Sequence, residues 1–144
     1  MSKYSAQGIL QYKKDGWLVL STPKSICEYY KWWVEKFLWK KATLPLHGSH
    51  VTVIAGKYND VSSHPCWQKY DGIKLSFYYD GVIYNDDDGY FWIKVECPEL
   101  AAIRQELGLP PQPFWPYHCT ICFINPNAKK TNTPAKNGVS NALK

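Results

Sequence analysis

The sequence predicts a single α+β domain made of two similar strand-helix-strand units with antiparallel sheets. The chain has 144 residues, which suits one domain with a substantial core. Short segments of alternating polar and apolar residues are typical of strands with one buried face, and two helical patterns lie among them. The order strand, helix, strand occurs twice, which indicates an internal duplication.

The first unit starts at the turn signal Asp15-Gly16. An apolar strand follows at residues 17–20, and Pro23 in a first turn starts a helix between residues 22 and 25. We expect one stripe of this helix to pack on the sheet, comprising Ile26, Tyr29, Tyr30, Trp33, Phe37 and Leu38. Residues 1–14 carry no clear pattern and are expected to form a surface loop.

Two connecting stretches separate the units. The polar residues 57–70 have no period of their own, and loops of this length in compact domains often bind ligands or act as lids. The apolar residues 73–79 and 82–84 flank Asp80-Gly81. Because Asp-Gly between apolar runs is typical of a tight turn, a hairpin is predicted there.

The second unit repeats the order of the first. The turn Asp88-Gly89 precedes a strand at residues 90–95, Pro98 starts a short helix, and a proline-rich segment leads to the last strand. The domain is therefore expected to span residues 1–124. Residues 125–144 are rich in Asn, Lys, Thr and Pro, and we expect them to form a loose polar tail.

Each unit ends in a motif of the form His-x-Thr-x, which is His50-Val51-Thr52-Val53 in the first and His118-Cys119-Thr120-Ile121 in the second. Successive side chains of a strand point to opposite faces, so the His and Thr of each motif share a face. If the two strands are neighbours, two imidazoles and two hydroxyls meet in a central cleft. This set is suited to acid-base chemistry on a phosphate, because imidazole can accept or donate a proton and hydroxyls can stabilise a charged oxygen.

Paired His-x-Thr-x motifs on a duplicated α+β fold resemble the 2H phosphoesterase superfamily. Within it, the small size, the motif spacing and the stretches at residues 17–20 and 29–33 are similar to phage nucleases that degrade the cyclic oligonucleotide signals of bacterial CBASS immunity. The resemblance implies a bilobal fold and metal-independent cleavage of a cyclic di- or trinucleotide, with no cofactor, in the infected host cytoplasm. It also implies His50 and His118 as base and acid, and Thr52 and Thr120 as donors to phosphate oxygens.

The aromatic content suggests where substrate could be held. Seven Trp, eleven Tyr and five Phe are more rings than a core of this size needs, so some are expected to line a pocket. Trp67 in the long polar loop is interpreted either as a lid that stacks on a base or as an anchor into the core. The candidate substrate-binding residues are Tyr12, Trp67, Trp115 and Tyr117.

The composition of the chain limits the classes of partner that we expect. A formal net charge of +5 and a pI near 8.9 favour an anionic partner. Only one basic residue is Arg, which argues against a reader of duplex DNA, because such proteins rely on bidentate Arg contacts. The odd count of five Cys, together with the lack of a signal-peptide pattern or a long apolar run, predicts a cytoplasmic protein with free thiols. No membrane and no obligate protein partner are expected.

Several alternatives remain open at this stage. The substrate could be a linear RNA end with a 2′,3′-cyclic phosphate or a 2′,5′ linkage, and a non-catalytic module for single-stranded nucleic acid is a further alternative. A zinc site could be assembled from His47, His50, His64, Cys66, His118, Cys119 and Cys122. In a regular strand, however, Cys119 and Cys122 face opposite sides. Since no third group is evident to activate water, we expect the substrate's own 2′-OH to attack.

Overall fold

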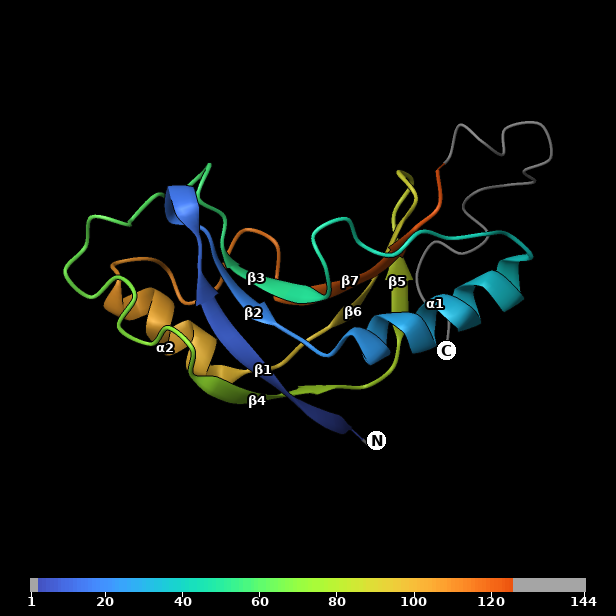
Figure 1. Cartoon of the computed structure of the whole chain (residues 1–144), viewed down its shortest axis with the longest axis horizontal. Coiled ribbons are helices and arrows are strands. Elements are labelled where there is room, and N and C mark those ends of the chain that lie inside the picture. The colour runs from blue at the N-terminus through green and yellow to red at the C-terminus, as the bar shows by residue number, and fades with distance from the viewer. Residues whose placement is uncertain (1–2, 126–144) are drawn as a thin grey trace.

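The computed structural model describes residues 3–125, so the predicted tail lies outside the described residues except for its first position. This part of the chain is an α+β fold with a curled antiparallel sheet of seven strands and two α-helices (Figure 1). The elements are β1 (Tyr4–Tyr12), a 3-10 turn (Lys14–Gly16), β2 (Leu18–Ser21), α1 (Lys24–Leu38), β3 (His50–Ile54), β4 (Lys74–Tyr79), β5 (Ile83–Asn85), β6 (Tyr90–Lys94), α2 (Pro98–Glu106) and β7 (His118–Phe123).

The sheet has the strand order β4-β1-β2-β3-β7-β6-β5, which places the two motif strands at its centre. One continuous sheet therefore joins the two predicted units. The sheet curls far enough for Tyr78 in β4 to meet Glu96 beyond the end of β6. Their backbones exchange two hydrogen bonds, with N···O distances of 2.9 and 2.8 Å.

The same strand pairing occurs on both sides of the central strands. Leu20 of β2 pairs with Val51 in β3, and Ile93 of β6 pairs with Cys119 in β7. The outer pairs also correspond, since β1 and β2 pair through Leu10↔Leu20 and β5 and β6 through Ile83↔Ile93. Leu20 and Ile93 are separated by the same number of positions as the two Asp-Gly turns of the sequence repeat. The predicted repeat and the observed registers therefore agree.

The N-terminal segment differs from its prediction. It forms the nine-residue strand β1 rather than a surface loop. Its pattern is weak because one face is open to solvent while Leu10 on the other face is fully buried. Gly8 permits close packing against β2, since a Cβ at that position would lie 2.7 Å from Cγ of Leu20.

The hairpin predicted around Asp80-Gly81 is wrong. Gly81 does turn the chain with a positive φ of 79°, and the Asp80 carboxylate accepts a hydrogen bond from the Val82 backbone. However, β4 pairs with β1, and β5 pairs with β6 at the opposite edge of the sheet. A local turn signal cannot specify which distant strand completes each edge.

Helix α1 starts within the predicted window but presents a different face to the core. Ile26, Cys27, Tyr30 and Val34 are its buried residues. Three aromatic residues of the predicted stripe, Tyr29, Trp33 and Phe37, are instead 56%, 46% and 63% exposed. The buried face of the helix thus includes Cys27 and Val34, which were not part of the predicted stripe.

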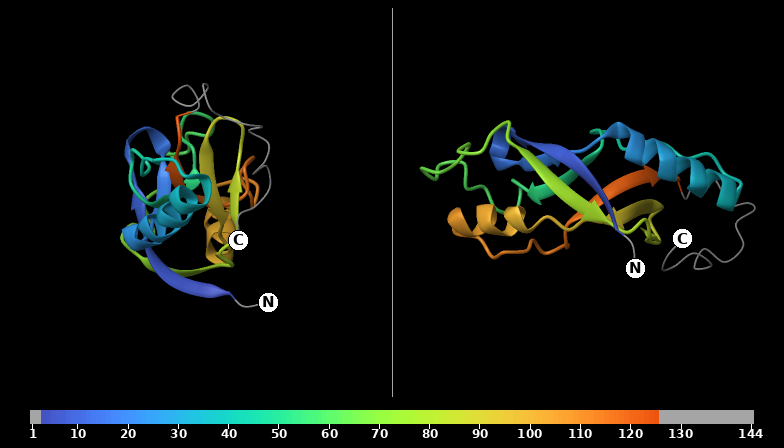
Figure 2. Two further views of the ribbon diagram at one scale, coloured as in Figure 1. Left: turned by 90° about the vertical axis from the view of Figure 1, so that its right-hand side faces the viewer. Right: turned by 90° about the horizontal axis from the view of Figure 1, so that it is seen from below.

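Each helix packs against the motif strand of the other unit. Helix α1 contacts β7, where the Cys27 thiol donates to the Thr120 carbonyl at 3.3 Å. Helix α2 contacts β3, where Arg104 Nη1 donates to the Val53 carbonyl at 2.8 Å. The two helices lie at opposite ends of the sheet in Figure 1 and again in the view from below in Figure 2. Neither helix of this part of the chain combines the length and apolarity needed to cross a membrane.

Candidate active site

The two motif strands are direct neighbours, with Val51 paired to Cys119. In an antiparallel pair this register sets His50 across from Thr120 and Thr52 across from His118. All four side chains lie on one face, opposite to the fully buried Val51 and Cys119. Each of the four is half-buried. The structure therefore brings together the four residues that the motifs predicted.

A β-bulge follows the Thr of each motif. Between β2 and β3 the pairing passes from Val19↔Thr52 to Leu18↔Ile54, which leaves Val53 as the extra residue. Between β6 and β7 the pairing passes from Trp92↔Thr120 to Phe91↔Cys122, which leaves Ile121 as the extra residue. A bulge increases local twist and re-aims side chains, and such features are common beside active sites.

Both His rings are held in the same way. Nδ1 of His50 lies 2.9 Å from the Gly48 carbonyl, and Nδ1 of His118 lies 2.8 Å from the Pro116 carbonyl. A carbonyl can only accept, so Nδ1 carries the hydrogen in each ring. The free nitrogen is therefore Nε2, which accepts a proton when the ring is neutral and donates one when the ring is charged. Two backbone carbonyls thus assign the reactive nitrogen of each imidazole.

The electrostatic surroundings of His50 favour its neutral form. Desolvation by burial is the largest cause that lowers its pKa from the ordinary value. The hydrogen bond to Gly48 opposes this shift, while the positive charge of Lys13 and the neighbouring rings of His47 and His118 lower the pKa further.

A buried polar layer supports the two strands from the core side. Ser49 Oγ lies 2.5 Å from Oγ1 of Thr22 and 3.2 Å from the Cys27 thiol. The Cys119 thiol lies 3.7 Å from both the Thr22 and the Ser49 hydroxyls. Hydrogen bonds from Cys27 and these hydroxyls lower the pKa of Cys119. Because Ser49 precedes His50 and Cys119 follows His118, this layer fixes the position of both motifs.

Two of the four predicted substrate-binding residues lie away from the His and Thr face. Tyr12 is paired with Leu18 on the helix side of the sheet, and its ring meets Trp67 edge-on with 4.8 Å between centroids. Both rings pack against the core. The structure thus favours the interpretation of Trp67 as an anchor, and neither ring is placed to contact substrate beside the motifs.

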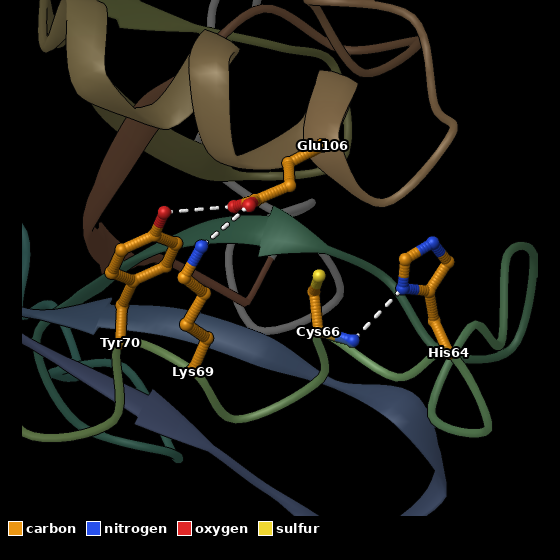
Figure 3. A network of polar contacts seen from close by, with 5 residues as sticks. All are labelled: His64, Cys66, Lys69, Tyr70 and Glu106. Atoms are coloured by element: carbon orange, nitrogen blue, oxygen red, sulfur yellow. Dashed lines mark hydrogen bonds and ion pairs between the residues drawn. The ribbon is translucent and has the colours of Figure 1, made fainter.

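The loop that carries Trp67 is fastened to α2 (Figure 3). The Lys69 ammonium and the Tyr70 hydroxyl each lie 2.8 Å from a carboxylate oxygen of Glu106. The hydrogen bond from Lys69, followed by that from Tyr70, lowers the pKa of Glu106. Nearby, His64 Nδ1 accepts the Cys66 backbone N–H at 3.0 Å. The two contacts to Glu106 hold the loop beside α2, whereas the bond between Cys66 and His64 lies within the loop.

The other two predicted substrate-binding residues differ from each other. Tyr117 is 6% exposed, because it precedes His118 by one position and so faces the core, where its hydroxyl donates to the Pro111 carbonyl at 2.9 Å. This corrects the expectation that Tyr117 contacts substrate. Trp115 is 68% exposed and meets Phe114 edge-on, so its ring is open to solvent.

Three residues that sequence reasoning did not select share the face of the motifs. Trp92 pairs with Thr120, and Lys94 pairs with His118. Tyr84 of β5 pairs with Trp92. Paired residues lie on the same face of a sheet, so these side chains flank the second motif. Alignment of the two sequence repeats would have found them, since it places Trp92 and Lys94 opposite Val19 and Ser21.

The positions of Cys119 and Cys122 bear on the alternative of a zinc site. Cys119 and Cys122 are both fully buried on the core side, because the bulge between them changes the alternation expected of a regular strand. Within residues 3–125, no three His, Cys, Asp or Glu side chains are arranged to hold a metal ion.

No family model matches this sequence, and no curated protein or solved structure gives a match. The geometry of the site and the two His-x-Thr-x motifs are therefore the observations that bear on its function.

Proposed function

We propose that this protein is a metal-independent phosphodiesterase that cleaves the 3′,5′ linkages of cyclic di- or oligonucleotides. The observation that carries the proposal is the single face on which two half-buried His, each with a free Nε2, meet two Thr hydroxyls across neighbouring strands. In such a pair, residues directly opposite have Cβ atoms ~4.5–5.5 Å apart and diagonal ones are at ~7–8 Å or slightly less. A phosphate between the diagonal His residues can be reached from both sides.

The environment of His50 supports one assignment of the two roles. His50 is the base, because burial and the nearby positive charge of Lys13 lower its pKa and favour the neutral ring. Its Nε2 takes the proton of a ribose 2′-OH, the 2′-oxygen bonds to phosphorus, and the bond from phosphorus to the 5′-oxygen breaks. His118 Nε2 gives a proton to that departing oxygen. The first products are a 2′,3′-cyclic phosphate and a free 5′-hydroxyl.

The Thr hydroxyls stabilise the negative charge that develops on the non-bridging oxygens of the phosphate. Thr120 lies across from the base and Thr52 across from the acid, so each hydroxyl is placed beside one end of the reacting phosphate. A hydroxyl that donates to a non-bridging oxygen is most effective where charge increases in the transition state.

The substrate class follows from charge and from the family resemblance. The net charge of +5 favours an anion, and the paired motifs resemble 2H phosphoesterases that act on cyclic oligonucleotides. In this proposal the two halves of the sheet are the lobes of a bilobal enzyme, and the motif strands form the floor of its cleft. Its role is to remove the alarm signals of CBASS immunity in the cytoplasm of an infected bacterium.

A substrate panel in EDTA tests the proposal. Purified protein is incubated with cyclic di- and trinucleotides, linear dinucleotides and RNA that ends in a 2′,3′-cyclic phosphate, and products are separated by chromatography. We expect cleavage of the cyclic nucleotides that is lost in His50→Ala. Cleavage of only the cyclic-phosphate RNA would support the RNA-processing alternative. Binding without turnover of any substrate, or an activity that requires added zinc or magnesium, would contradict the proposal.

A further inference from the structure

A row of rings extends from the second motif toward the sheet edge. The Trp92 ring lies edge-on to the His118 ring, with 6.2 Å between centroids and 65° between planes. On its other side, Trp92 stacks with Tyr84 at 6.4 Å and 24°. The Lys94 ammonium lies 4.8 Å from the centroid of the Tyr84 ring. Two nearly parallel rings and a cation are thus placed immediately beside one imidazole.

This row lies on the same face as the reacting groups. The pairs Trp92↔Thr120 and Lys94↔His118 are cross-strand neighbours, and Tyr84↔Trp92 continues the row to β5. Tyr84 and Trp92 are half-buried, whereas Lys94 is exposed. The rings therefore retain surface that a ligand can cover, and the cation can reach solvent or a bound anion.

The other side of the site has no such row. The positions equivalent to Tyr84, Trp92 and Lys94 are Gln11, Val19 and Ser21, which pair with one another and with the first motif in the same registers. At these three positions the fold thus forms the same strand pairs without a ring or a charge. Cross-strand packing alone does not account for the aromatic and basic side chains on β5 and β6.

We propose that Trp92 and Tyr84 form a stacking platform for a nucleobase of the substrate, and that Lys94 holds a phosphate oxygen of the same nucleotide. This proposal rests on the proposed function. Since His118 protonates the departing 5′-oxygen in that proposal, the platform holds the base of the nucleoside that carries this 5′-oxygen. Aromatic stacking accepts any base, and the larger face of a purine favours it over a pyrimidine.

The platform is tested by binding, separately from cleavage. A cyclic dinucleotide with one 2-aminopurine is titrated into the His50→Ala protein, and 2-aminopurine fluorescence is recorded, because stacking on a ring quenches it. Trp92→Leu and Tyr84→Ala are expected to relieve the quenching and to raise Kd roughly five- to hundredfold each. Lys94→Gln is expected to raise Kd and to weaken its dependence on salt.

The equivalent positions supply matched controls. Gln11→Ala and Ser21→Ala remove side chains at the corresponding places on the other side, and neither is expected to change quenching or Kd. The conservative variants Trp92→Phe and Tyr84→Phe retain a ring and are expected to restore most of the binding. Thermal unfolding of every variant shows whether it folds.

Each outcome separates the two proposals. If the wild-type protein cleaves cyclic dinucleotides but the folded Trp92 and Tyr84 variants bind and quench as the controls do, the platform is overturned and the proposed function remains. If the variants lose quenching but the wild-type protein cleaves nothing, the platform stands and the proposed function fails. If Trp92→Leu does not fold while Trp92→Phe folds without restoring the quenching, the ring pair is structural and the platform is overturned.

Discussion

The two sides of the central strand pair contain the same arrangement of His, Thr and bulge in different surroundings. Each side has a His whose Nδ1 donates to the carbonyl two residues earlier, a Thr on the same face, and a bulge at the next residue. The strands beside them differ. On one side Val19 and Ser21 pair with the first motif, and on the other Trp92 and Lys94 pair with the second.

Under the proposed function, this difference corresponds to a division between reaction and substrate binding. Groups that act on both sides of a phosphorus atom are needed twice, whereas groups that hold one nucleotide are needed on one side only. The surroundings also affect His50 directly, since burial and Lys13 lower its pKa. The proposed enzyme would thus combine a repeated geometry with different surroundings on its two sides.

The largest expected effect comes from the substrate. In the proposed mechanism, a cyclic dinucleotide with 2′-deoxyribose at both positions lacks the hydroxyl from which His50 would take a proton, but retains the 5′-oxygen that His118 would protonate. We expect binding without cleavage, because an intramolecular nucleophile can be worth an effective concentration of ~10⁵–10⁸ M. Calorimetry measures the binding and chromatography the products. Cleavage at a rate near that of the ribonucleotide would show that water attacks instead.

The next effect tests whether both sides are equally necessary. His50→Ala and His118→Ala are each expected to lower kcat/KM by ~10²–10⁴, because each removes one proton transfer. His64→Ala is the control, since its ring accepts a backbone hydrogen bond in the loop beside α2 and takes no part in the site. A mild loss in one variant beside a severe loss in the other would show that only one side supplies acid-base chemistry.

Substitution of the hydroxyls compares the two sides more finely. Thr52→Ala and Thr120→Ala are each expected to lower kcat by ~10²–10³, as removal of an oxyanion donor does. Thr→Ser retains the donor and is expected to keep much of the activity. Steady-state kinetics at saturating substrate provides the measurement. If Thr52→Ser folds normally and is as inactive as Thr52→Ala, the hydroxyl does not act as a phosphate donor.

A smaller effect is expected from pH. The pKa of His50 is lowered below the ordinary ~6.5, so kcat/KM rises with pH through that lowered value and the acidic limb lies below about pH 6.5. The unfolded chain takes up the proton more readily, so the contribution of His50 to stability is present above ~6.5 and is lost as pH falls through the lowered pKa. Lys13→Gln is expected to move the acidic limb to higher pH, and an unmoved limb in kinetic profiles would exclude Lys13 as a cause.

The smallest effect concerns the helices that support each motif strand. Arg104, 2% exposed, donates to the Val53 and Pro110 carbonyls, both at 2.8 Å. Arg104→Ala removes the donor to the buried Val53 carbonyl and is expected to cost about 1–3 kcal/mol of unfolding free energy. Cys27→Ala removes the weaker thiol donor to Thr120 and is expected to cost less. Urea unfolding orders the two variants, and an unchanged midpoint for Arg104→Ala would contradict its supporting role.

The sequence predicted what depends on short-range pattern. Alternation placed His50 and Thr52 on one face, and the repeat of turn, strand, helix and motif indicated that the second motif is equivalent. The pairing of strands that are distant in the sequence could not be predicted from such local patterns. The strand β1 has one solvent face, so its alternation is weak, and the Asp80-Gly81 turn carries no information about which edge each flanking strand joins.

The candidate binding residues illustrate the same limit. Tyr12 lies in an N-terminal segment without a clear pattern and Trp67 in a long loop, so the sequence does not show which way either ring faces. Trp92 lies on the face of the motif because it pairs with Thr120 of β7. That pairing follows from the fold of the whole chain and not from any local segment.

Each helix packs on the motif strand of the other unit, and this arrangement has a consequence for unfolding. With α1 seated on β7 and α2 on β3, a fragment that ends at Asp80 has its first helix but lacks the strand on which that helix rests, and the complementary fragment lacks β3 in the same way. The core side chains Val34 and Leu100, both 0% exposed, would then lose part of their packing. We therefore expect that neither fragment completes a core alone, that cleavage at Gly81 gives two pieces that depend on each other, and that the intact chain unfolds in a single cooperative transition.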